Sequence, residues 1–379
     1  MNEHLLDLRP YPMAELQARK AAIQARGIEL VDFGVGDPIE PTPPFIPAAL
    51  RAAIPAISQY PSVTGTSTLR AAAAAYLQRR FGCRLDPERA ILPSAGSKEA
   101  IFHLALAFLD PASQRDTVLY GTPGYPVYQH GCLFAGGREL PVVLERATGY
   151  RLDLTRLDRE ALTRTRIAWF NYPHNPTGAC VDAAYWREQA AVCREHGIIL
   201  ASDECYCDLH VHDEAPPSAL AAGTAGVLAF HSCSKRSGMT GYRSGFIVGD
   251  PELIATYRRW RAAMGVASPA FIEAAATAAW SDDDHVAERR GIFTAKRAVL
   301  EAGLHERGIA VLPSHAGLYC WARVPRPHGD ADAYAQELLE AGIVVSPGGF
   351  FGAGGAGWFR CALVPSLDDC RRAMQRWPD

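Results

Sequence analysis

The stretch from residue 197 to residue 204, GIILASDE, decides the expected fold. It is an apolar run of strand length that ends in a carboxylate, Asp203. Similar runs are RAILP (89–93), TVLYG (117–121), RIAWFN (166–171), VLAFHS (227–232) and GFIVG (245–249). Such runs alternate with helical patterns, which is typical of a mostly parallel sheet covered by helices on both faces. In sheets of this kind, ligands bind at the carboxyl ends of the strands.

The length of the chain predicts two domains, because 379 residues exceed the size at which one hydrophobic core usually stops growing. The alternating pattern covers residues 45–285 and predicts a large α/β domain. Residues 286–379 begin with a long charged helical stretch and continue with mixed strands and a helix, which predicts a smaller α+β domain. Residues 1–44 form an N-terminal arm, with an amphipathic helix near 13–26, and we expect this arm to join the smaller domain.

Composition and charge exclude several classes of protein. The chain is 48% hydrophobic and 21% charged, with a net charge of −3 and scattered basic residues, which argues for a globular protein that binds no nucleic acid. No apolar run reaches the roughly 20 residues that span a bilayer, and no secretory signal opens the chain. We therefore expect a cytoplasmic protein with no membrane partner.

Of ten cysteines only Cys205 and Cys207 lie close together, so we expect reduced thiols and no metal site.

The chain has only four lysines, at positions 20, 98, 235 and 296. Lys20 and Lys296 lie in amphipathic helical patterns among charged residues, and we expect both on solvated faces. Lys235 differs, because it follows the strand 227–232, where a parallel sheet would present its amine to a ligand. Lys235 is therefore the candidate nucleophile.

Two loops carry residues suited to binding a phosphate group. Ser232 and Ser234 precede the candidate lysine, and Arg243 follows it eight residues later, so hydroxyls and a guanidinium could hold an anion beside an amine. Upstream, the segment Gly96-Ser97-Lys98 leads into a helix, where free N–H groups and the helix dipole favour a dianion. An ordinary polar loop and a simple capped helix are the alternatives.

Further polar side chains follow the ends of two predicted strands. Asp203 ends the strand 198–203, where a carboxylate could keep a pyridine nitrogen protonated, and Tyr206 follows three residues later. Asn175 lies in the turn Asn-Pro-Thr-Gly after the strand 166–171, and its amide could donate to a ring oxygen. A capping carboxylate and a plain turn remain possible when each feature is taken alone.

The order of these motifs resembles that of the class I aminotransferases in the fold type I pyridoxal-phosphate family. The matching pieces are GVGDP (34–38), Y-P-x-x-x-G-x-x-x-L-R (60–70), P-G-Y-P (123–126), N-P-T-G (175–178), S-D-E-x-Y (202–206), S-x-S-K (232–235) and a late arginine at 360. The resemblance extends over nearly the whole chain. It implies a large domain with a mostly parallel seven-stranded sheet, a smaller α+β domain and pyridoxal 5′-phosphate as the cofactor.

The same resemblance implies a role for each matching residue. Lys235 would hold the cofactor as a Schiff base and move the substrate's proton, and Asp203 would pair with the pyridinium nitrogen. Tyr206 and Asn175 would bind the ring oxygen, and Tyr125 would stack on the ring. The phosphate would be bound by Gly96, Ser97, Lys98, Ser232, Ser234 and Arg243.

The resemblance implies that three further residues contact the substrate or the neighbouring subunit. Arg360 would bind the substrate α-carboxylate, and Gly36 would allow the main chain to approach it closely. Tyr60 would reach the phosphate of the neighbouring subunit, which implies a homodimer with its active site at the subunit interface. The expected partners are thus amino acids, 2-oxo acids and a second copy of the chain.

A narrower resemblance is to the N-succinyldiaminopimelate aminotransferases of bacterial lysine biosynthesis. It is carried by SDECY followed by EAPP (214–217), FHSCSKRSGMTGYRSGF (230–246) and AAWSDDDHVAERR (278–290). It implies ping-pong amino transfer from N-succinyl-LL-diaminopimelate to 2-oxoglutarate. The alternatives are another amino donor, such as LL-diaminopimelate, aspartate, methionine or an aromatic amino acid, and a β-lyase that uses the same cofactor. A regulator that keeps the cofactor as a sensor is disfavoured, because the arm before residue 30 is too short for a DNA-binding module.

Overall fold

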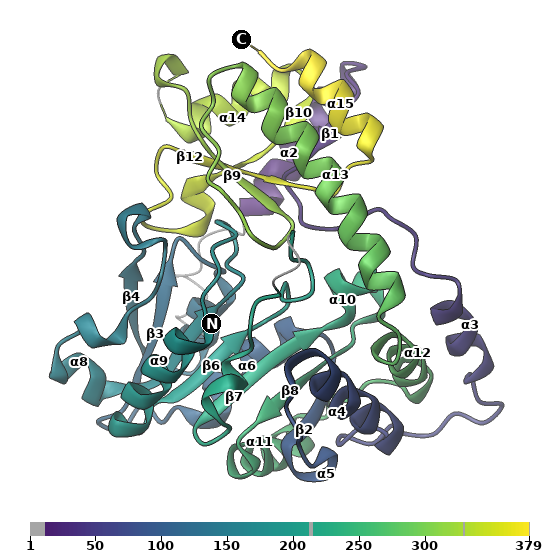
Figure 1. Cartoon of the computed structure of the whole chain (residues 1–379), viewed down its shortest axis with the longest axis vertical. Coiled ribbons are helices and arrows are strands. Elements are labelled where there is room, and N and C mark those ends of the chain that lie inside the picture. The colour runs from purple at the N-terminus through teal and green to yellow at the C-terminus, as the bar shows by residue number, and fades with distance from the viewer. Residues whose placement is uncertain (1–11, 212–214, 329, 379) are drawn as a thin grey trace.

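The computed structural model describes residues 12–211, 215–328 and 330–378, and its centre is a seven-stranded sheet (Figure 1). In chain order the strands are β2 (Ile91–Ser94), β3 (Thr117–Thr122), β4 (Arg138–Val143), β5 (Thr165–Asn171), β6 (Ile199–Asp203), β7 (Val227–Ser232) and β8 (Gly245–Gly249). Their spatial order is β2-β8-β7-β6-β5-β3-β4. Only β8 runs antiparallel to its neighbours, so the predicted, mostly parallel seven-stranded sheet is confirmed.

Helices cover both faces of this sheet, because its central strands are apolar on both sides. In β5, Ile167 and Trp169 pack against one set of helices, whereas Ala168 and Phe170 pack against the other. The first face is covered by α6 (Ser97–Phe108), α7 (Val127–Phe134) and α11 (Pro251–Met264), and the second by α4 (Ser67–Phe81), α9 (Ala183–His196) and α12 (Ala270–Trp280). Short helices complete this part, namely α3 (Phe45–Ala52), α5 (Pro87–Ala90), α8 (Arg159–Arg164) and α10 (Cys233–Arg236).

The strand β4 was not expected from the sequence. It lies at the edge of the sheet, parallel to β3, and most of its side chains are exposed or half-buried. Edge strands lack the continuous apolar pattern of buried ones, so the RELPVV sequence (138–143) gives little signal.

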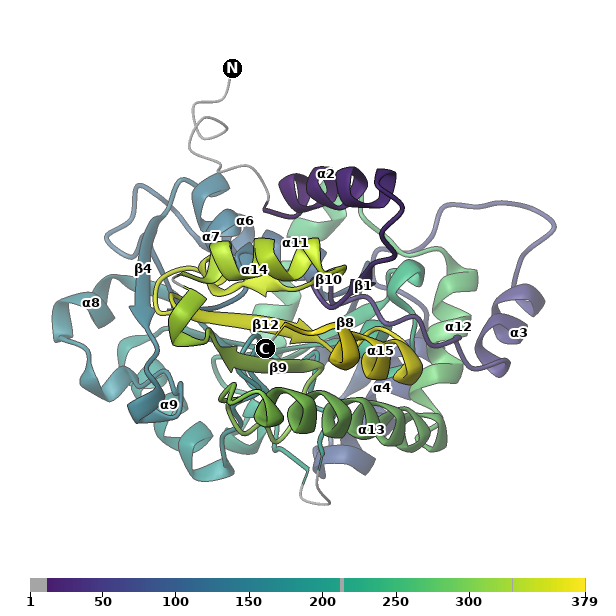
Figure 2. The same ribbon diagram turned by 90° about the horizontal axis from the view of Figure 1, so that it is seen from above.

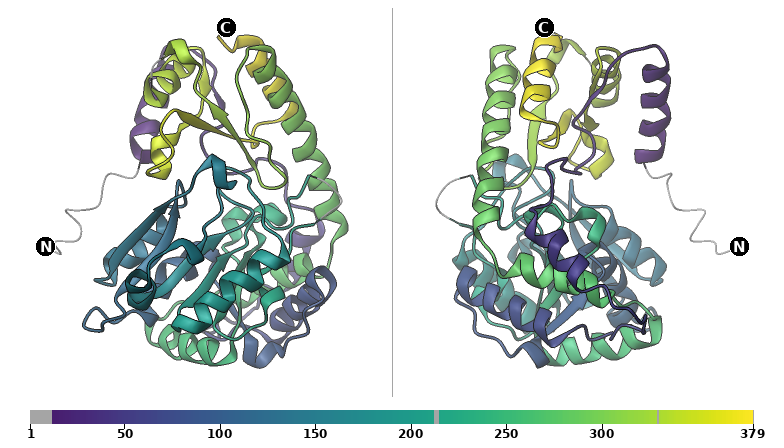
Figure 3. Two further views of the ribbon diagram at one scale, coloured as in Figure 1. Left: turned by 60° about the vertical axis from the view of Figure 1, so that its left-hand side comes forward. Right: turned by 90° about the vertical axis from the view of Figure 1, so that its right-hand side faces the viewer.

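A second, smaller layer lies above the carboxyl ends of the sheet in Figure 1. Its strands are β1 (Val31–Asp32), β9 (Tyr319–Arg323), β10 (Ile343–Val344), β11 (Ser346–Pro347) and β12 (Trp358–Ala362), and its helices are α2 (Pro12–Ala25), α13 (Asp284–Glu306), α14 (Ala331–Glu340) and α15 (Leu367–Arg376). β1 pairs with β10, so the N-terminal segment lies among C-terminal elements. Seen from above, α2 lies beside α14 (Figure 2), and α13 and α2 lie on opposite flanks of the layer (Figure 3). The domain boundaries at residues 44 and 285 stay a prediction.

The expectation that Lys20 and Lys296 lie on solvated faces is wrong. The side chain of Lys296 on α13 is only 1% exposed, and its Nζ donates to Glu40 and to the carbonyl of Leu363. Lys20 is paired with Asp32 at 2.5 Å, and its side chain is 14% exposed. Both acidic partners belong to the segment after α2, which a helical pattern alone does not place against these lysines. Within the described ranges, no helix is long and apolar enough to cross a membrane.

Candidate active site

The register of three neighbouring strands brings two distant loops together at one edge of the sheet. Gly245, the first residue of the antiparallel strand β8, pairs with Ser94 at the end of β2 and with Ser232 at the end of β7. The start of α6 follows β2 within three residues, and α10 follows β7 directly. The two sequence segments with phosphate-binding character are therefore neighbours.

These segments form what we call the anion cradle, defined by Gly96, Ser97, Lys98, Ser232, Ser234 and Arg243. Gly96 caps α6 with a φ of 78°, which favours glycine, and a Cβ there would lie 2.5 Å from the Arg243 guanidinium and displace it. Ser232 Oγ accepts from the Ser234 amide at 3.1 Å. Partial burial and the nearby Arg243 lower the pKa of Lys98. The cradle thus combines cations, hydroxyls and a helix N-terminus.

Lys235 lies on α10, directly after the end of β7, and its amine faces a cavity. Burial lowers the pKa of Lys235 to about 8, although the negative charge of Asp37 opposes this shift. Its Nζ donates to the Gly36 carbonyl. About a tenth of this amine is therefore unprotonated at pH 7, far more than for an ordinary lysine, and it is this form that nucleophilic and proton-transfer chemistry requires.

Asp203, the last residue of β6, is buried at the same sheet edge. It accepts a hydrogen bond from Tyr128 Oη at 2.8 Å and one from the Cys205 amide at 3.3 Å. Burial raises its pKa despite these hydrogen bonds. A protonated partner would relieve this cost, because a buried carboxylate stays ionised most readily beside a cation. Tyr128 and Cys205 were not singled out as site residues in the sequence.

Arg360 on β12 reaches the cavity from the smaller layer and is buried. Its Nη1 donates to Asn175 Oδ1 at 2.9 Å, and its Nη2 donates to the Gly34 carbonyl at 2.8 Å. The guanidinium carbon lies 4.2 Å from the ring centre of Tyr319 and 4.5 Å from that of Phe351. The two rings and the hydrogen bonds fix the orientation of the cation.

The cavity between the two layers has a volume of about 240 Å³. It is lined by Gly34, Val35, Gly36, Tyr125, Pro126, Asn175, Tyr206, Lys235, Tyr319, Ser346, Phe350, Phe351 and Arg360. Within this lining, Tyr206 Oη lies 2.9 Å from Tyr319 Oη. The sequence did not indicate Tyr319, Phe350 or Phe351, which carry no motif of their own. Their only signal is position, because each lies in the C-terminal part that also supplies Arg360.

Tyr60 lies apart from this cavity and is fully exposed in the single chain. It belongs to the segment between α3 and α4, on which Ile54 and Ile57 are 57% and 77% exposed. The structure thus brings the predicted site residues together with the exception of Tyr60. Its predicted contact with a neighbouring subunit stays a prediction.

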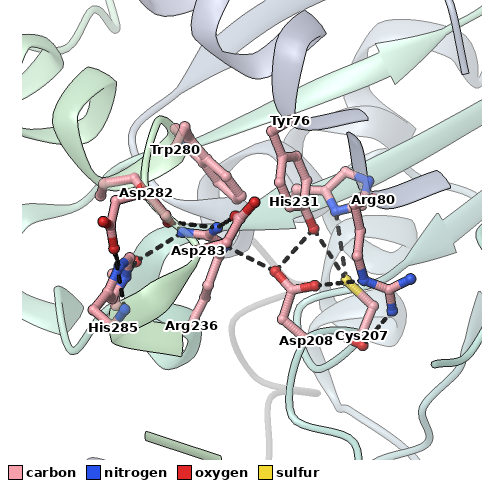
Figure 4. A network of polar contacts seen from close by, with 12 residues as sticks. Tyr76, Arg80, Cys207, Asp208, His231, Arg236, Trp280, Asp282, Asp283 and His285 are labelled. Atoms are coloured by element: carbon pink, nitrogen blue, oxygen red, sulfur yellow. Dashed lines mark hydrogen bonds and ion pairs between the residues drawn. The ribbon is translucent and has the colours of Figure 1, made fainter. Parts of the chain in front are cut away.

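A polar network around Arg236, the residue that follows Lys235 on α10, connects α10 to the neighbouring elements (Figure 4). Asp208 accepts hydrogen bonds from Tyr76 Oη at 2.9 Å, Arg80 Nε at 2.9 Å and Arg236 Nε at 2.8 Å. The Arg236 guanidinium lies against the rings of both Tyr76 and Trp280, with its carbon 5.0 Å and 4.9 Å from their centres. Burial would raise the pKa of Asp208, but the charges of Arg236 and Arg80 hold it below its usual range.

We expect Asp208→Asn to lower the free energy of unfolding by about 3 kcal/mol, because it leaves the part-buried Arg80 without a carboxylate and the buried Arg236 with Asp283 alone. Asp368→Asn is the matched control: Asp368 forms an exposed ion pair with Arg371, and its loss should cost about 0.5 kcal/mol or less. Urea denaturation measures both. Because the pKa of Asp208 is lowered by folding, its contribution is present above the unfolded pKa and is lost as the pH falls through the folded pKa. Equal costs for the two variants would refute the central role of Asp208.

Among the described residues, no group of three or more histidine, cysteine or acidic side chains could hold a metal ion. The cysteines are free, and burial raises the pKa of several of them, including Cys205. The site is therefore built from an amine, a carboxylate, a guanidinium and an anion cradle.

Comparisons with known proteins agree with this geometry. The family described as aminotransferase class I and II matches residues 28–376. An LL-diaminopimelate aminotransferase of Nitratidesulfovibrio vulgaris (strain DP4) is 37% identical over 380 residues, which cover 99% of this chain and 97% of that protein. Among solved structures, a probable N-succinyldiaminopimelate aminotransferase from Thermus thermophilus superimposes with a TM-score of 0.89 at 28% identity, covering 96% of this chain and 98% of that one. A mutant aspartate aminotransferase of Thermus thermophilus gives a TM-score of 0.92 at 26% identity, covering 100% and 98%.

Proposed function

This chain belongs to the aminotransferase class I and II family, and we propose that it uses pyridoxal 5′-phosphate to exchange amino groups between amino acids and 2-oxo acids. One observation carries the proposal: a single cavity is lined by the buried amine of Lys235 and the buried guanidinium of Arg360. An amine that can hold a carbonyl cofactor thus lies across one cavity from a cation that can hold a carboxylate.

The residues present fit this cofactor. The anion cradle supplies the groups that bind a phosphate dianion, and Gly96 leaves open the space beside Arg243 that a Cβ would fill. Tyr125 lines the cavity with a flat aromatic face, on which a pyridine ring could stack. Asp203, whose pKa is raised by burial, would pair with the ring nitrogen, and Lys235 would hold the cofactor through Nζ. Tyr206 and Asn175 would donate to the ring oxygen.

The bound cofactor supplies an electron-withdrawing ring that lowers the cost of removing the proton from the substrate's α-carbon. Asp203 supports this effect, because an ionised carboxylate in a buried site keeps the ring nitrogen protonated. Lys235 Nζ would take the α-proton and return it to the neighbouring cofactor carbon. Its pKa of about 8 suits both directions, since the charged and the neutral amine differ in free energy by only about 1.4 kcal/mol at pH 7.

Arg360 would bind the α-carboxylate of every amino acid and 2-oxo acid that enters the cavity. Its Nη1 and Nη2 already donate to Asn175 and Gly34, and its Nε has no partner among the described residues. The flanking rings of Tyr319 and Phe351 exclude water, which strengthens a charge-assisted hydrogen bond. Gly36 lies beside this carboxylate site.

For the amino donor we infer LL-diaminopimelate in the first place. The support is the set of LL-diaminopimelate aminotransferases that are 34–37% identical to this chain over nearly its full length. Lysine and diaminopimelate biosynthesis would then be the metabolic context.

N-succinyl-LL-diaminopimelate is the second candidate. It is favoured by the segments SDECY, FHSCSKRSGMTGYRSGF and AAWSDDDHVAERR, and by the likeness to the Thermus thermophilus structure. The two donors share the reacting α-amino acid and differ only at the far end, where one has a free amine and the other a succinylated one.

The test loads the purified protein with pyridoxal 5′-phosphate and adds single amino acids while its visible absorption is recorded. The panel holds both diaminopimelate donors, glutamate, aspartate, methionine and phenylalanine; the last two are included because Phe350 and Phe351 give the cavity an apolar wall. Rapid loss of the visible band with LL-diaminopimelate and glutamate supports the first candidate. Loss with the succinylated donor replaces it by the second, and loss only with an apolar donor overturns both. Failure to bind the cofactor would overturn the proposal as a whole.

We also propose that the working unit is a homodimer in which Tyr60 reaches the neighbouring active site. The exposed apolar side chains of Ile54 and Ile57 beside it are typical of a surface that is covered by a partner. Tyr60→Ala and Lys235→Ala are each expected to be impaired alone. After subunit exchange, a mixture of the two should regain activity in about a quarter of the sites, because half of the random dimers are mixed and each has one intact site. No recovery after proven exchange would exclude a shared site.

A further inference from the structure

Tyr319 connects the two ends of the cavity. It is the first residue of β9, its side chain is buried, and it lines the cavity between the layers. Its hydroxyl lies 2.9 Å from the Tyr206 hydroxyl, and its ring lies under the Arg360 guanidinium. A Cβ on Gly36 would approach the same hydroxyl to 2.6 Å, so the main chain at Gly36 closes over it. No sequence motif indicated this residue.

The direction of the hydrogen bond between Tyr319 and Tyr206 decides whether the Tyr206 proton is available to the cavity. A tyrosine hydroxyl has one proton to donate, and either of the two hydroxyls can be the donor in this contact. If Tyr206 donated to Tyr319, the single Tyr206 proton could not also be donated to an acceptor in the cavity. If Tyr319 donates to Tyr206, the Tyr206 proton is free for an acceptor in the cavity, and each hydrogen bond strengthens the next.

The hydrogen-bond contacts of this pair favour the second arrangement. Burial raises the pKa of Tyr206 well above its ordinary value, so Tyr206 keeps a proton that it can donate. Among the described residues, the only hydrogen-bond partner recorded for Tyr319 Oη is Tyr206. A relay from Tyr319 through Tyr206 to a ring oxygen therefore lets both hydroxyls donate.

The ring of Tyr319 contacts the guanidinium of Arg360. The guanidinium is held between two aromatic faces, and Tyr319 supplies the nearer one. One side chain thus contacts both the tyrosine proposed to bind the ring oxygen and the arginine proposed to bind the carboxylate.

We propose that Tyr319 is a positioning residue that directs the Tyr206 proton toward the cofactor's ring oxygen through its hydroxyl and orients Arg360 through its ring. The inference rests on the proposed function, and it adds a residue through which substrate binding at Arg360 and the electronic state of the cofactor are coupled.

Two substitutions separate the two contacts. Tyr319→Phe removes only the hydroxyl, whereas Tyr319→Leu removes the hydroxyl and the aromatic face. Without the relay, Tyr206 donates more weakly and the ring oxygen becomes more basic. The pH midpoint of the bound cofactor's visible absorption should therefore rise in both variants, by an amount on the order of half a pH unit. The KM for amino acids should change less than about twofold in Tyr319→Phe and rise roughly tenfold in Tyr319→Leu.

The background variant Tyr206→Phe shows whether Tyr319 acts through Tyr206. In that background, Tyr319→Phe should cause no further shift of the midpoint, because the proton that it directs is already absent. Tyr257→Phe is the matched control: Tyr257 is equally buried, donates to the Ala100 carbonyl at 2.8 Å on the far face of the sheet, and should leave the midpoint unchanged.

The outcomes distinguish this inference from the proposed function. A wild-type protein without visible absorption after loading would overturn the proposed function itself. A normal wild type together with an unchanged midpoint in Tyr319→Phe would overturn the relay alone, as would an additional shift in the Tyr206→Phe background. If Tyr319→Phe melts far below the wild type, the cycle is repeated with Tyr319→Leu, whose midpoint must also rise.

Discussion

Replacement of Lys235 by alanine is expected to lower the rate of amino transfer by at least about a thousandfold, because it removes both the covalent anchor of the cofactor and the base that moves the α-proton. The fold should persist, since α10 is held by Arg236 and its contacts with Asp208 and Ala279. The variant should still bind pyridoxal 5′-phosphate through the anion cradle, without the visible band of the covalently attached form. Single-turnover transfer with the best donor from the panel measures the loss.

Lys20→Ala is the matched control for this experiment. Lys20 also forms a polar contact, with Asp32, but it lies on α2 outside the cavity, so its loss should leave the turnover rate within about twofold of the wild type. Near wild-type transfer by Lys235→Ala would refute the proposed chemistry.

The pKa of Lys235 predicts how the rate of cofactor attachment depends on pH. Only the unprotonated amine is nucleophilic, and burial lowers the pKa of this group to about 8. Attachment of the cofactor to the apoprotein should therefore accelerate as the pH rises and should level off above about pH 8. A rate that kept rising toward pH 10 would indicate an ordinary, solvated lysine.

Replacement of Arg360 by alanine is expected to lower kcat/KM for every amino acid by about a hundredfold or more, because a charge-assisted, two-point hydrogen bond to the α-carboxylate is lost. Cofactor binding should remain within a few-fold of the wild type, since the anion cradle belongs to the other layer. Arg360→Lys should recover only part of the loss, because an ammonium group cannot donate in the same planar pair.

Arg323→Ala serves as the control for Arg360. Arg323 lies at the end of β9, opposite Trp358 of the neighbouring strand β12, and its side chain is exposed. Its loss should leave kcat/KM nearly unchanged. An Arg360→Ala enzyme with intact kcat/KM for all donors would show that another group binds the carboxylate.

The sequence predicted the parts of the site that depend on the ends of strands. Asp203 ends one apolar run and Lys235 lies three residues after another, and parallel strands present their carboxyl ends at one edge, so the sequence predicts that the two side chains lie close together. The loop of Ser232 and the start of α6 were also recognisable, because hydroxyls, a glycine and a helix start have a local pattern.

Other features could not be predicted, because they depend on contacts between distant segments. Tyr319 and Phe351 are ordinary aromatic residues in the sequence, and only the packing of the smaller layer brings their rings against Arg360. Lys296 was expected in solvent because its helix is rich in charge, whereas its partner Glu40 lies 256 residues away. Burial of a charged side chain is decided by such a partner, which helical spacing does not show.

The antiparallel strand β8 has a consequence for the range of substrates. Because Gly245 pairs with Ser232, the loop that carries Lys235 and Arg243 starts and ends at the same place in the sheet. Those two side chains are therefore anchored to the same place in the sheet, whereas Arg360 belongs to the strand β12 of the smaller layer. The groups that would hold the cofactor thus have fixed positions relative to one another, whereas their distance from Arg360 depends on how the two layers pack. Over the course of evolution, a small change in the packing between the layers would admit longer or shorter amino acids, while Lys235 and the anion cradle would bind the cofactor as before.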